Sequence, residues 1–342
     1  MQRVTVAIAT PIERELVERI RRVDERLDVL FEPDLLPPPR YPSDHGGEPG
    51  FTRTPEQEER FAQIVAGAEV ALGFPGESAA GLAWLVRTAP HLRFVQCMYA
   101  GAGQQVRAAN LSPSELDRVA FASSSGVHAV PLAEWSLFGI LALTKGLPRL
   151  LRDKRDRRWD HYPVRELPGK TLLVVGFGEI GREVARLAEA FGMRVVAIKR
   201  TADHTAAGPE RLHELVAEAD AIVVTLPLTD ETRGLIGREA LAGIRDGAIL
   251  VNVGRGAVVD EGALVDALTS GKLAGAALDV FAEEPLPASS PLWELENVIL
   301  SPHTAALSLR ENERIVELFA DNLGRYLRGD ELRSRIRTSV YY

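Results

Sequence analysis

Cysteine is almost absent from this chain: Cys97 is the only one among 342 residues. An intrachain disulfide and a cysteine-cluster metal site are therefore excluded, and we expect no metal site and a reducing, cytoplasmic environment. Positive charge is not in excess either, since 40 Lys and Arg stand against 48 Asp and Glu, for a formal net charge of −8. That balance argues against nucleic acid or an anionic membrane as a partner.

Long apolar runs are also missing. No segment approaches the ~18 apolar residues of a membrane-spanning helix. The first apolar run, residues 4–9, is too short for the core of a signal peptide and indicates a first strand instead. We therefore expect neither a membrane span nor a secretion signal.

What the chain does contain is an ordinary globular composition, 46% hydrophobic and 26% charged, at a length that suggests two domains. Apolar β-formers alternate with helical patterns throughout, which predicts parallel sheets with helices on both faces. Predicted strands cover residues 4–10, 27–31, 69–73, 93–98, 172–175, 194–198, 221–225, 248–252 and 274–278. Predicted helices include residues 12–23, 55–66, 79–88, 130–151 and 309–327. The fold class we expect is α/β, with two Rossmann-like or flavodoxin-like domains and a cleft between them.

A Gly-x-Gly-x-x-Gly motif, formed by Gly176, Gly178 and Gly181, joins a predicted strand to a predicted helix. In a dinucleotide-binding turn the first glycine permits a sharp bend and the second lets the backbone approach a pyrophosphate. The third lets the helix pack against the strand, so that its N-terminal N–H groups face the phosphates. The alternative is a glycine-rich structural turn, but the strand-to-helix context favours a nucleotide.

The next strand ends in Lys199, Arg200 and Thr201 rather than in the Asp or Glu that binds the ribose of NAD. Two cations and a hydroxyl suit the additional 2′-phosphate of NADP. The pair could also be only a charged strand end. Given the glycine motif, we expect a preference for NADP(H), with NAD(H) still possible.

Three polar residues follow apolar strands in the second half of the chain: Arg255, Glu284 and His303. Ligands of open α/β sheets bind beyond the carboxyl ends of strands. Arg can hold a carboxylate and polarise a carbonyl, His can exchange a proton, and Glu can favour the protonated imidazole. Each residue also has an ordinary structural interpretation, as a cap, a salt bridge or a surface charge, and spacing alone does not bring them together.

Short motifs that match one known family run through most of the chain. They are residues 100–101, 126–128, 133–134, 176–181, 226–232, 252–256, 279–281 with 284–285, and 301–303. In these motifs the chain resembles the D-isomer-specific 2-hydroxyacid dehydrogenases, and its basic tip at Lys199 is similar to that of the NADP-linked glyoxylate and hydroxypyruvate reductases. The resemblance implies a discontinuous substrate domain, residues 1–102 and 306–342, and a Rossmann domain, residues 103–305. It also implies a homodimer.

The resemblance gives roles to individual residues. Arg255, Glu284 and His303 take the catalytic positions. Tyr99, Ala100, Gly101 and again Arg255 take substrate-binding positions, with the amides around Ala100 and Gly101 holding the substrate carboxylate. The cofactor positions fall on Gly176, Gly178, Glu179, Ile180, Gly181, Lys199, Arg200, Thr201, Pro227, Thr232, Val253 and Asp279, of which Asp279 would contact the nicotinamide carboxamide.

The chain departs from the family pattern at two places. Ser123 stands where many members carry Asn, which weakens an expected cofactor contact. Cys97, Met98 and Tyr99 stand where smaller polar residues are common, so their bulk would shape the substrate pocket. Formate dehydrogenases also resemble this family, but they carry Gln beside the histidine, and Glu284 argues against that assignment.

These residues predict an oxidoreductase in which NADPH reduces a 2-keto acid to a D-2-hydroxy acid reversibly, with His303 as general acid and base. An alternative is a corepressor-type protein of the same fold that binds NAD(H) without significant turnover, because fold alone does not separate enzyme from binder. A methyltransferase, whose nucleotide loop is also glycine-rich, would leave the basic tip and His303 unexplained. The apolar segment 130–151 is either a dimer surface or a buried interdomain helix.

Overall fold

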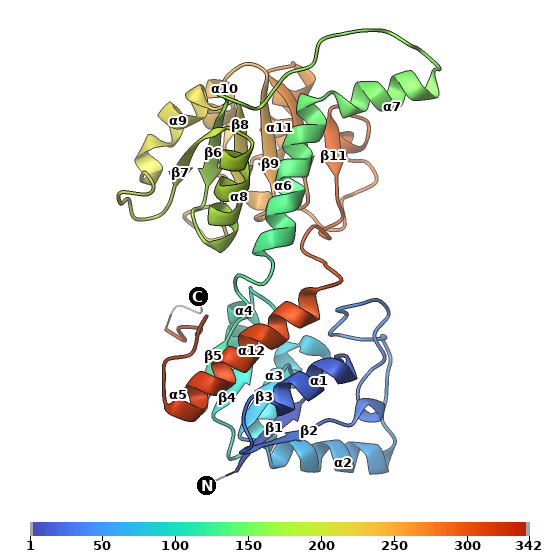
Figure 1. The fold of residues 1–342 in the computed structure, drawn as a ribbon, viewed down its shortest axis with the longest axis vertical. Coiled ribbons are helices and arrows are strands. Elements are labelled where there is room, and N and C mark those ends of the chain that lie inside the picture. The colour runs from blue at the N-terminus through green and yellow to red at the C-terminus, as the bar shows by residue number, and fades with distance from the viewer. Residues whose placement is uncertain (1–2, 340–342) are drawn as a thin grey trace. The chain divides into compact units, whose positions relative to one another are not determined.

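The computed structural model describes residues 3–339 and divides them into two compact units (Figure 1). The first unit contains the described residues up to Val127 together with those from Leu307 onward, and the second runs from His128 to Ala306. The first boundary between the two units, after Val127, therefore lies later in the chain than the predicted boundary after residue 102. The reason is that β5 (Ala120–Ala122) pairs with β4 (Phe94–Gln96), which ties the intervening segment to the first unit.

The first unit is built on a five-stranded sheet in the order β2-β1-β3-β4-β5. All its strand pairs are parallel, and this order is that of flavodoxin-like folds. The chain order reverses between β1 and β3, so the carboxyl ends of these strands form a switch point. Besides β4 and β5, the strands are β1 (Val4–Ile8), β2 (Leu27–Leu30) and β3 (Val70–Leu72).

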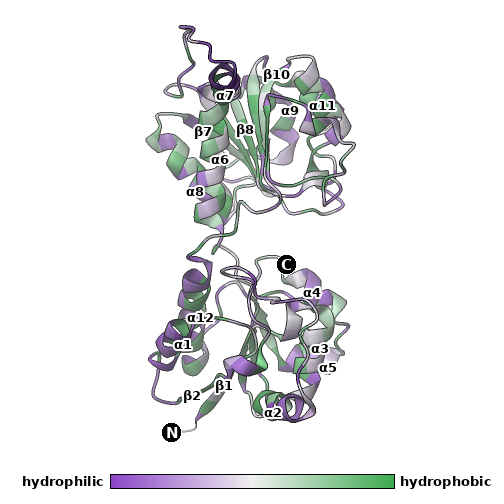
Figure 2. Cartoon of the chain, turned by 90° about the vertical axis from the view of Figure 1, so that its right-hand side faces the viewer, coloured by the Kyte–Doolittle hydropathy of each residue, from purple (hydrophilic) through white to green (hydrophobic). Residues whose placement is uncertain are grey.

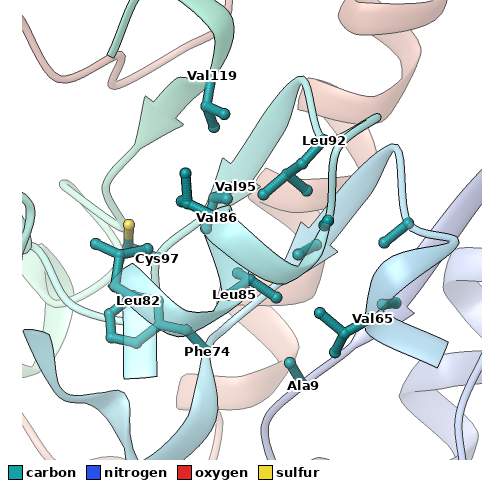
Figure 3. Packing of buried hydrophobic residues seen from close by; sticks show 14 of the residues in the cluster. Ala9, Val65, Phe74, Leu82, Leu85, Val86, Leu92, Val95, Cys97 and Val119 are labelled. Atoms are coloured by element: carbon teal, nitrogen blue, oxygen red, sulfur yellow. The ribbon is translucent and has the colours of Figure 1, made fainter. Parts of the chain in front are cut away.

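Helices cover both faces of this sheet, and each face has its own apolar core. On one side Phe74, Leu82 and Val95 pack together, as Figure 3 shows. On the other, α1 packs against α12 beneath the strands. The helices are α1 (Arg14–Arg21), α2 (Pro55–Ala66), α3 (Ala79–Thr88), α4 (Gly103–Ala108), α5 (Pro113–Arg118) and α12 (Glu311–Arg328), with short 3₁₀ turns η1 (Pro33–Leu35) and η2 (Pro75–Glu77).

The second unit holds a six-stranded parallel sheet in the order β11-β10-β9-β8-β6-β7. Here the chain leaves β6 for β7 on one side and then crosses to β8 on the other, so the switch point lies between β6 and β8. Strands β6, β8 and β9 are buried at every residue, as parallel strands covered on both faces are. Strand β8 is also apolar along its whole length and appears green in Figure 2. The strands are β6 (Thr171–Val175), β7 (Arg194–Ile198), β8 (Ala221–Val224), β9 (Ala248–Asn252), β10 (Leu273–Leu278) and β11 (Val298–Leu300).

The single helix predicted over residues 130–151 is wrong, because the chain forms two helices there. These are α6 (Ala129–Thr144) and α7 (Leu147–Arg155). Gly146 caps α7 in the left-handed conformation, with φ +69°, and this turn ends α6. No single helix within residues 3–339 is long and apolar enough to cross a membrane. Helices α6 and α7 taken together, with a bend of 61° between them, have the length and composition of a span.

The remaining helices of the second unit flank its sheet. They are α8 (Glu179–Ala190), α9 (Leu212–Glu218), α10 (Arg238–Gly243) and α11 (Glu261–Thr269), with 3₁₀ turns η3 (Pro209–Arg211), η4 (Gly256–Val258) and η5 (Pro291–Trp293). Helix α8 starts at Glu179, directly after the second glycine of the motif, so Gly181 lies in its first turn. The helix packs against α6 and β6. The motif therefore lies at the switch point of this sheet.

Candidate active site

Two of the three motif glycines are required by the packing of the protein itself. Gly176 has φ +110°, and a Cβ there would lie 2.7 Å from Thr225 Oγ1. A Cβ on Gly181 would lie 2.1 Å from the carbonyl oxygen of Gly176, so only glycine lets α8 approach the turn. The Thr225 hydroxyl donates a 2.6 Å hydrogen bond to that same oxygen. Sequence reasoning missed Thr225, which fixes the turn from the end of β8.

Gly178 is different, because an added Cβ there would meet nothing within 4 Å. The residue is exposed and precedes the first residue of α8, where no side chain caps the helix. The N–H groups of this first turn carry the positive end of the helix dipole. The open space beside Gly178 and these donors fit a dinucleotide pyrophosphate.

The basic tip follows β7, and its three residues differ in their contacts. Lys199 forms an ion pair with Asp203. Arg200 is exposed and makes no ion pair with any residue from 3 to 339, and Thr201 is also exposed. One of the two expected phosphate-binding cations therefore already has a carboxylate partner within its own loop.

The turn after β9 presents Arg255. Asn252 holds the turn, accepting from the Gly254 amide at 3.0 Å and donating to the Arg255 carbonyl oxygen at 3.1 Å. A Cβ on Gly256 would lie 1.9 Å from the Phe281 carbonyl carbon, so glycine is needed for this turn to lie against the segment after β10. The Arg255 guanidinium is exposed and donates one hydrogen bond, to the Gly254 oxygen at 2.6 Å. Its other N–H groups remain available to a ligand.

Glu284 and His303 form a direct pair. Nδ1 of His303 lies 2.7 Å from Oε2 of Glu284, while Oε1 of Glu284 accepts from the Phe281 amide at 3.0 Å. Burial alone would raise the pKa of the Glu284 carboxyl. The hydrogen bonds from His303 and Phe281 and the nearby charge of Arg255 outweigh burial and hold this pKa below its usual value. Glu284 is therefore an ionised acceptor for the Nδ1 proton.

Asp279 anchors the loop that carries His303. Its carboxylate, only 1% exposed, accepts from the amides of Thr304 at 2.9 Å and Ala305 at 3.0 Å. Its backbone oxygen accepts from the His303 amide at 3.0 Å. Burial raises the pKa of Asp279, although these hydrogen bonds oppose the shift. His303 itself has φ +54°, a left-handed conformation that this anchoring holds in place.

The structure thus brings Arg255, Asp279, Glu284 and His303 to the carboxyl ends of three adjacent strands, β9, β10 and β11, within one unit. Gly256 lies against Phe281, and the Phe281 amide donates to Glu284, so the turn that carries Arg255 adjoins the loop that carries Glu284. A cation, a carboxylate and an imidazole at one sheet edge can bind an anion and move a proton. Asn252, which shapes this edge, was noted in the sequence only as part of the motif 252–256, and no role was predicted for it.

Other expected cofactor residues lie around the same edge. The Thr232 hydroxyl donates to the Pro227 oxygen at 2.7 Å, which closes the loop after β8. Val253 is buried, and its amide donates to the Val224 oxygen at 3.1 Å. In the first turn of α8, Glu179 pairs with Arg182, and Ile180 is half-buried. Their contacts with a cofactor, and that of Asp279 with the nicotinamide, stay predictions.

The expected substrate-carboxylate residues belong to the first unit, after β4. Ala100 and Gly101 are exposed, and the backbone oxygen of Tyr99 accepts from the Ser124 amide at 3.2 Å. Burial and nearby acidic groups raise the pKa of the Tyr99 phenol, and the His45 ring packs edge-on against it. Both the predicted contact of these residues with substrate and the predicted cleft stay predictions.

Ser123 occupies the position at which the family commonly has Asn. Its backbone amide donates to the Ser334 oxygen at 2.9 Å, and its hydroxyl donates to the same oxygen at 3.4 Å. Ser123 therefore holds the C-terminal segment of the first unit. The serine that replaces the common asparagine therefore has a structural role at this position.

Fold and site together describe a dinucleotide-binding protein with a histidine–carboxylate pair, and comparisons of sequence define it further. The profile of the "D-isomer specific 2-hydroxyacid dehydrogenase, NAD binding domain" matches residues 137–305. Glyoxylate reductase of Aeropyrum pernix is 46% identical over 169 residues, which are 48% of this chain and 50% of that protein. (S)-sulfolactate dehydrogenase of Chromohalobacter salexigens is 40% identical over 221 residues, 61% of this chain and 70% of that protein.

A solved structure extends the similarity to nearly the whole chain. The D-isomer specific 2-hydroxyacid dehydrogenase from Xanthobacter autotrophicus Py2, in complex with NADPH and MES, superposes with a TM-score of 0.75 at 27% identity. The superposition covers 98% of this chain and 100% of that one. This chain belongs to the D-isomer specific 2-hydroxyacid dehydrogenase family. Its match to the Aeropyrum relative spans about half of that protein's length.

Proposed function

We propose that this protein catalyses the reversible reduction of a 2-keto acid to a D-2-hydroxy acid, with a preference for NADPH. The observation that carries the proposal is the 2.7 Å pair of His303 and Glu284 at the sheet edge that also presents Arg255. The relatives support a small substrate, since those with reported names include glyoxylate reductases and a sulfolactate dehydrogenase. Glyoxylate and hydroxypyruvate are the first acids to test.

The residues around Gly178 and the N-terminus of α8 would hold the pyrophosphate of the cofactor, and Lys199 with Arg200 would bind its 2′-phosphate. When bound, the reduced nicotinamide supplies the hydride that reduces the keto carbon. The NADPH complex of the Xanthobacter relative supports this choice of cofactor. The basic tip is the reason for preferring NADP(H) over NAD(H).

His303 would deliver the proton that the reduced oxygen requires. Glu284 is an ionised acceptor at Nδ1, so Nδ1 keeps its proton and Nε2 is the nitrogen that gains and loses one. Arg255 would bind the substrate carboxylate and polarise the carbonyl, because its planar guanidinium matches a carboxylate. Glu284 and Asp279 act by orienting the imidazole.

Replacing His303 tests this mechanism. We expect His303→Ala to lower kcat at least ~100-fold, the lower range for general acid–base catalysis, while binding of NADPH is retained. The measurement is NADPH oxidation with glyoxylate, hydroxypyruvate and phenylpyruvate. His161→Ala, in the exposed loop after α7, is the matched control and should be active.

Near-normal turnover of His303→Ala would remove His303 from the mechanism. If the unaltered protein binds NAD(P)H but turns over none of a broad panel of keto acids, the activity itself is rejected. That result would favour the corepressor-type binding protein. Binding and turnover therefore need to be measured on the same preparation.

We also propose a homodimer in the cytoplasm. Helix α7 projects from the second unit (Figure 1) and exposes Leu150 and Leu151, followed by Trp159, which is 90% exposed. Phe138 on α6 is 48% exposed. Apolar side chains of this size favour burial against a partner, and a second copy of this chain is the occupant we propose. The single cysteine, which is buried, agrees with a reducing compartment.

A further inference from the structure

We propose that Asp203 sets how strongly this protein discriminates between NADPH and NADH, because it competes with the cofactor 2′-phosphate for Lys199. The inference rests on the proposed use of NADP(H) and names a residue that controls it. It concerns the loop between β7 and η3, which carries all three residues of the basic tip.

The loop is a closed turn that returns to its own strand. The Lys199 amide donates to the Ala207 oxygen at 3.0 Å, and the Ala207 amide donates to the Ala197 oxygen at 2.9 Å. Across the turn, the Asp203 amide donates to the Ala206 oxygen at 3.0 Å. The backbone therefore fixes the position of Asp203 relative to Lys199.

The two carboxylate oxygens of Asp203 accept hydrogen bonds from different partners. Oδ1 accepts from the Thr205 amide at 2.8 Å, the Thr205 hydroxyl at 2.6 Å and the Ala206 amide at 3.2 Å, which stabilises the turn. Oδ2 accepts from the Lys199 ammonium. The hydrogen bonds from Lys199 and Thr205 hold the pKa of Asp203 far below its usual range, so the carboxylate is ionised at every pH of interest.

Lys199, one of the two cations expected to bind the phosphate, is therefore already paired with Asp203. Lys199 is 28% exposed and Asp203 41% exposed, so a ligand can reach the pair. A phosphate monoester carries about −1.5 to −2 charges at neutral pH. It must draw the ammonium away from Asp203 or share it, and it meets the repulsion of that carboxylate. Arg200, which has no such partner among residues 3–339, would bind the phosphate without this competition.

A ligand without the 2′-phosphate does not need Lys199 and is indifferent to Asp203. The competition therefore reduces the affinity for NADPH selectively. The native protein should therefore discriminate between NADPH and NADH less strongly than it would if both Lys199 and Arg200 lacked a carboxylate partner. Removing the charge of Asp203 while keeping the turn should increase it.

Asp203→Asn makes this change, because the amide oxygen of Asn can keep the three contacts of Oδ1 while the negative charge is lost. The ligands are adenosine 2′,5′-bisphosphate and 5′-AMP, which differ only in the 2′-phosphate, and binding is measured by calorimetry. We expect Asp203→Asn to bind the bisphosphate roughly fivefold more tightly, the effect of releasing one exposed ion pair. Binding of 5′-AMP and the melting temperature should not change.

Two further variants separate competition from a general charge effect. Glu210→Gln removes an exposed carboxylate in η3 that forms no hydrogen bond or ion pair with Lys199, and it should leave bisphosphate binding close to that of the native protein. In the Lys199→Gln background, Asp203→Asn should lose most of its gain, since the contested cation is gone. An undiminished gain in that background, or weaker bisphosphate binding by a folded Asp203→Asn, overturns the proposal.

The same measurements distinguish this proposal from the proposed cofactor preference. If the native protein prefers the bisphosphate and Asp203→Asn does not change that preference, the role of Asp203 is rejected alone. If the native protein has no preference and Asp203→Asn acquires one, Asp203 competes as proposed and the NADPH preference is rejected. If neither protein distinguishes the two ligands, both proposals are rejected.

Discussion

Glu77 is a buried carboxyl in the first unit, beside the switch point of its sheet. One oxygen accepts from the Phe74 amide at 3.2 Å, and within residues 3–339 the other has no hydrogen-bond partner. Burial raises the pKa of Glu77 to about 8 from 4.5. The side chain is therefore neutral in the folded protein over a range of pH in which an unfolded chain would ionise it.

The sign of the pH effect follows from that shift. Because the pKa is raised in the folded state, the contribution of neutral Glu77 to the free energy of unfolding is fully present below about pH 4.5. It is lost as the pH rises toward 8, by up to about 1.4 kcal/mol for each pH unit. Glu77→Gln cannot ionise, so we expect its melting temperature to fall less than that of the native protein between pH 5 and pH 8. Thermal unfolding at several pH values measures this, with Glu59→Gln on the surface of α2 as the control. Parallel curves for Glu77→Gln and the native protein would contradict it.

Single residues also mark the limit of what the sequence could predict about the site. Arg255, Glu284 and His303 were recognisable because each is a reactive residue type that follows an apolar run within a few residues. The contribution of Asn252 and Asp203 was not, because both act through contacts across a turn whose geometry depends on backbone conformation. The clash that makes Gly256 necessary is with Phe281, which is distant in sequence and adjacent only in the folded sheet.

The turn between β6 and α8 offers a comparison between two substitutions of the same kind. Gly181→Ala places a Cβ 2.1 Å from a backbone oxygen, so we expect a lower melting temperature and disturbed packing of α8. Gly178→Ala meets no atom of the protein within 4 Å and should fold normally. We expect Gly178→Ala to weaken NADPH binding at least about tenfold, since its methyl group would occupy the approach of the pyrophosphate. Unchanged NADPH affinity in Gly178→Ala would show that the cofactor does not approach this position.

Helices and strands were predicted best where the chemical signals are local. Helix α2 matches its predicted range, since Pro55 follows the N-cap Thr54 and Gln57 completes a capping box. Strands β7 and β9 also match their predicted ranges. The three-residue strands β5 and β11 were missed, because so short a run has no measurable alternation and depends on its neighbour in the sheet. The break between α6 and α7 was missed because the apolar pattern continues through Gly146.

For the assembled molecule, the exposed apolar residues of α7 give a direct test of the proposed dimer. Leu151→Asp introduces a charge at a side chain that is 58% exposed, so the folded chain should tolerate it. We expect this variant to be monomeric where the native protein is dimeric, as measured by light scattering after gel filtration. Lys154→Asp, on the same helix, changes charge without removing an apolar contact and is the control. A native protein that is monomeric at micromolar concentration would reject the dimer.

The two-unit organisation could be anticipated from the alternation of strands and helices, but the point of division could not. It depends on which sheet β5 joins, and that is a long-range pairing. The apolar clusters follow the same division, since each of the four draws its buried residues from one unit.

The discontinuity of the first unit affects the order in which the protein can fold during synthesis. Helix α12 supplies Phe319 to the core on Phe94, and Asn322 donates to Gln96 at 2.9 Å. Both residues emerge from the ribosome only after the whole of the second unit. The N-terminal strands are therefore made first yet must wait, with one apolar face uncovered, while the later unit is already complete and able to fold. Until α12 arrives, that sheet is an exposed apolar surface of the kind that chaperones protect from aggregation.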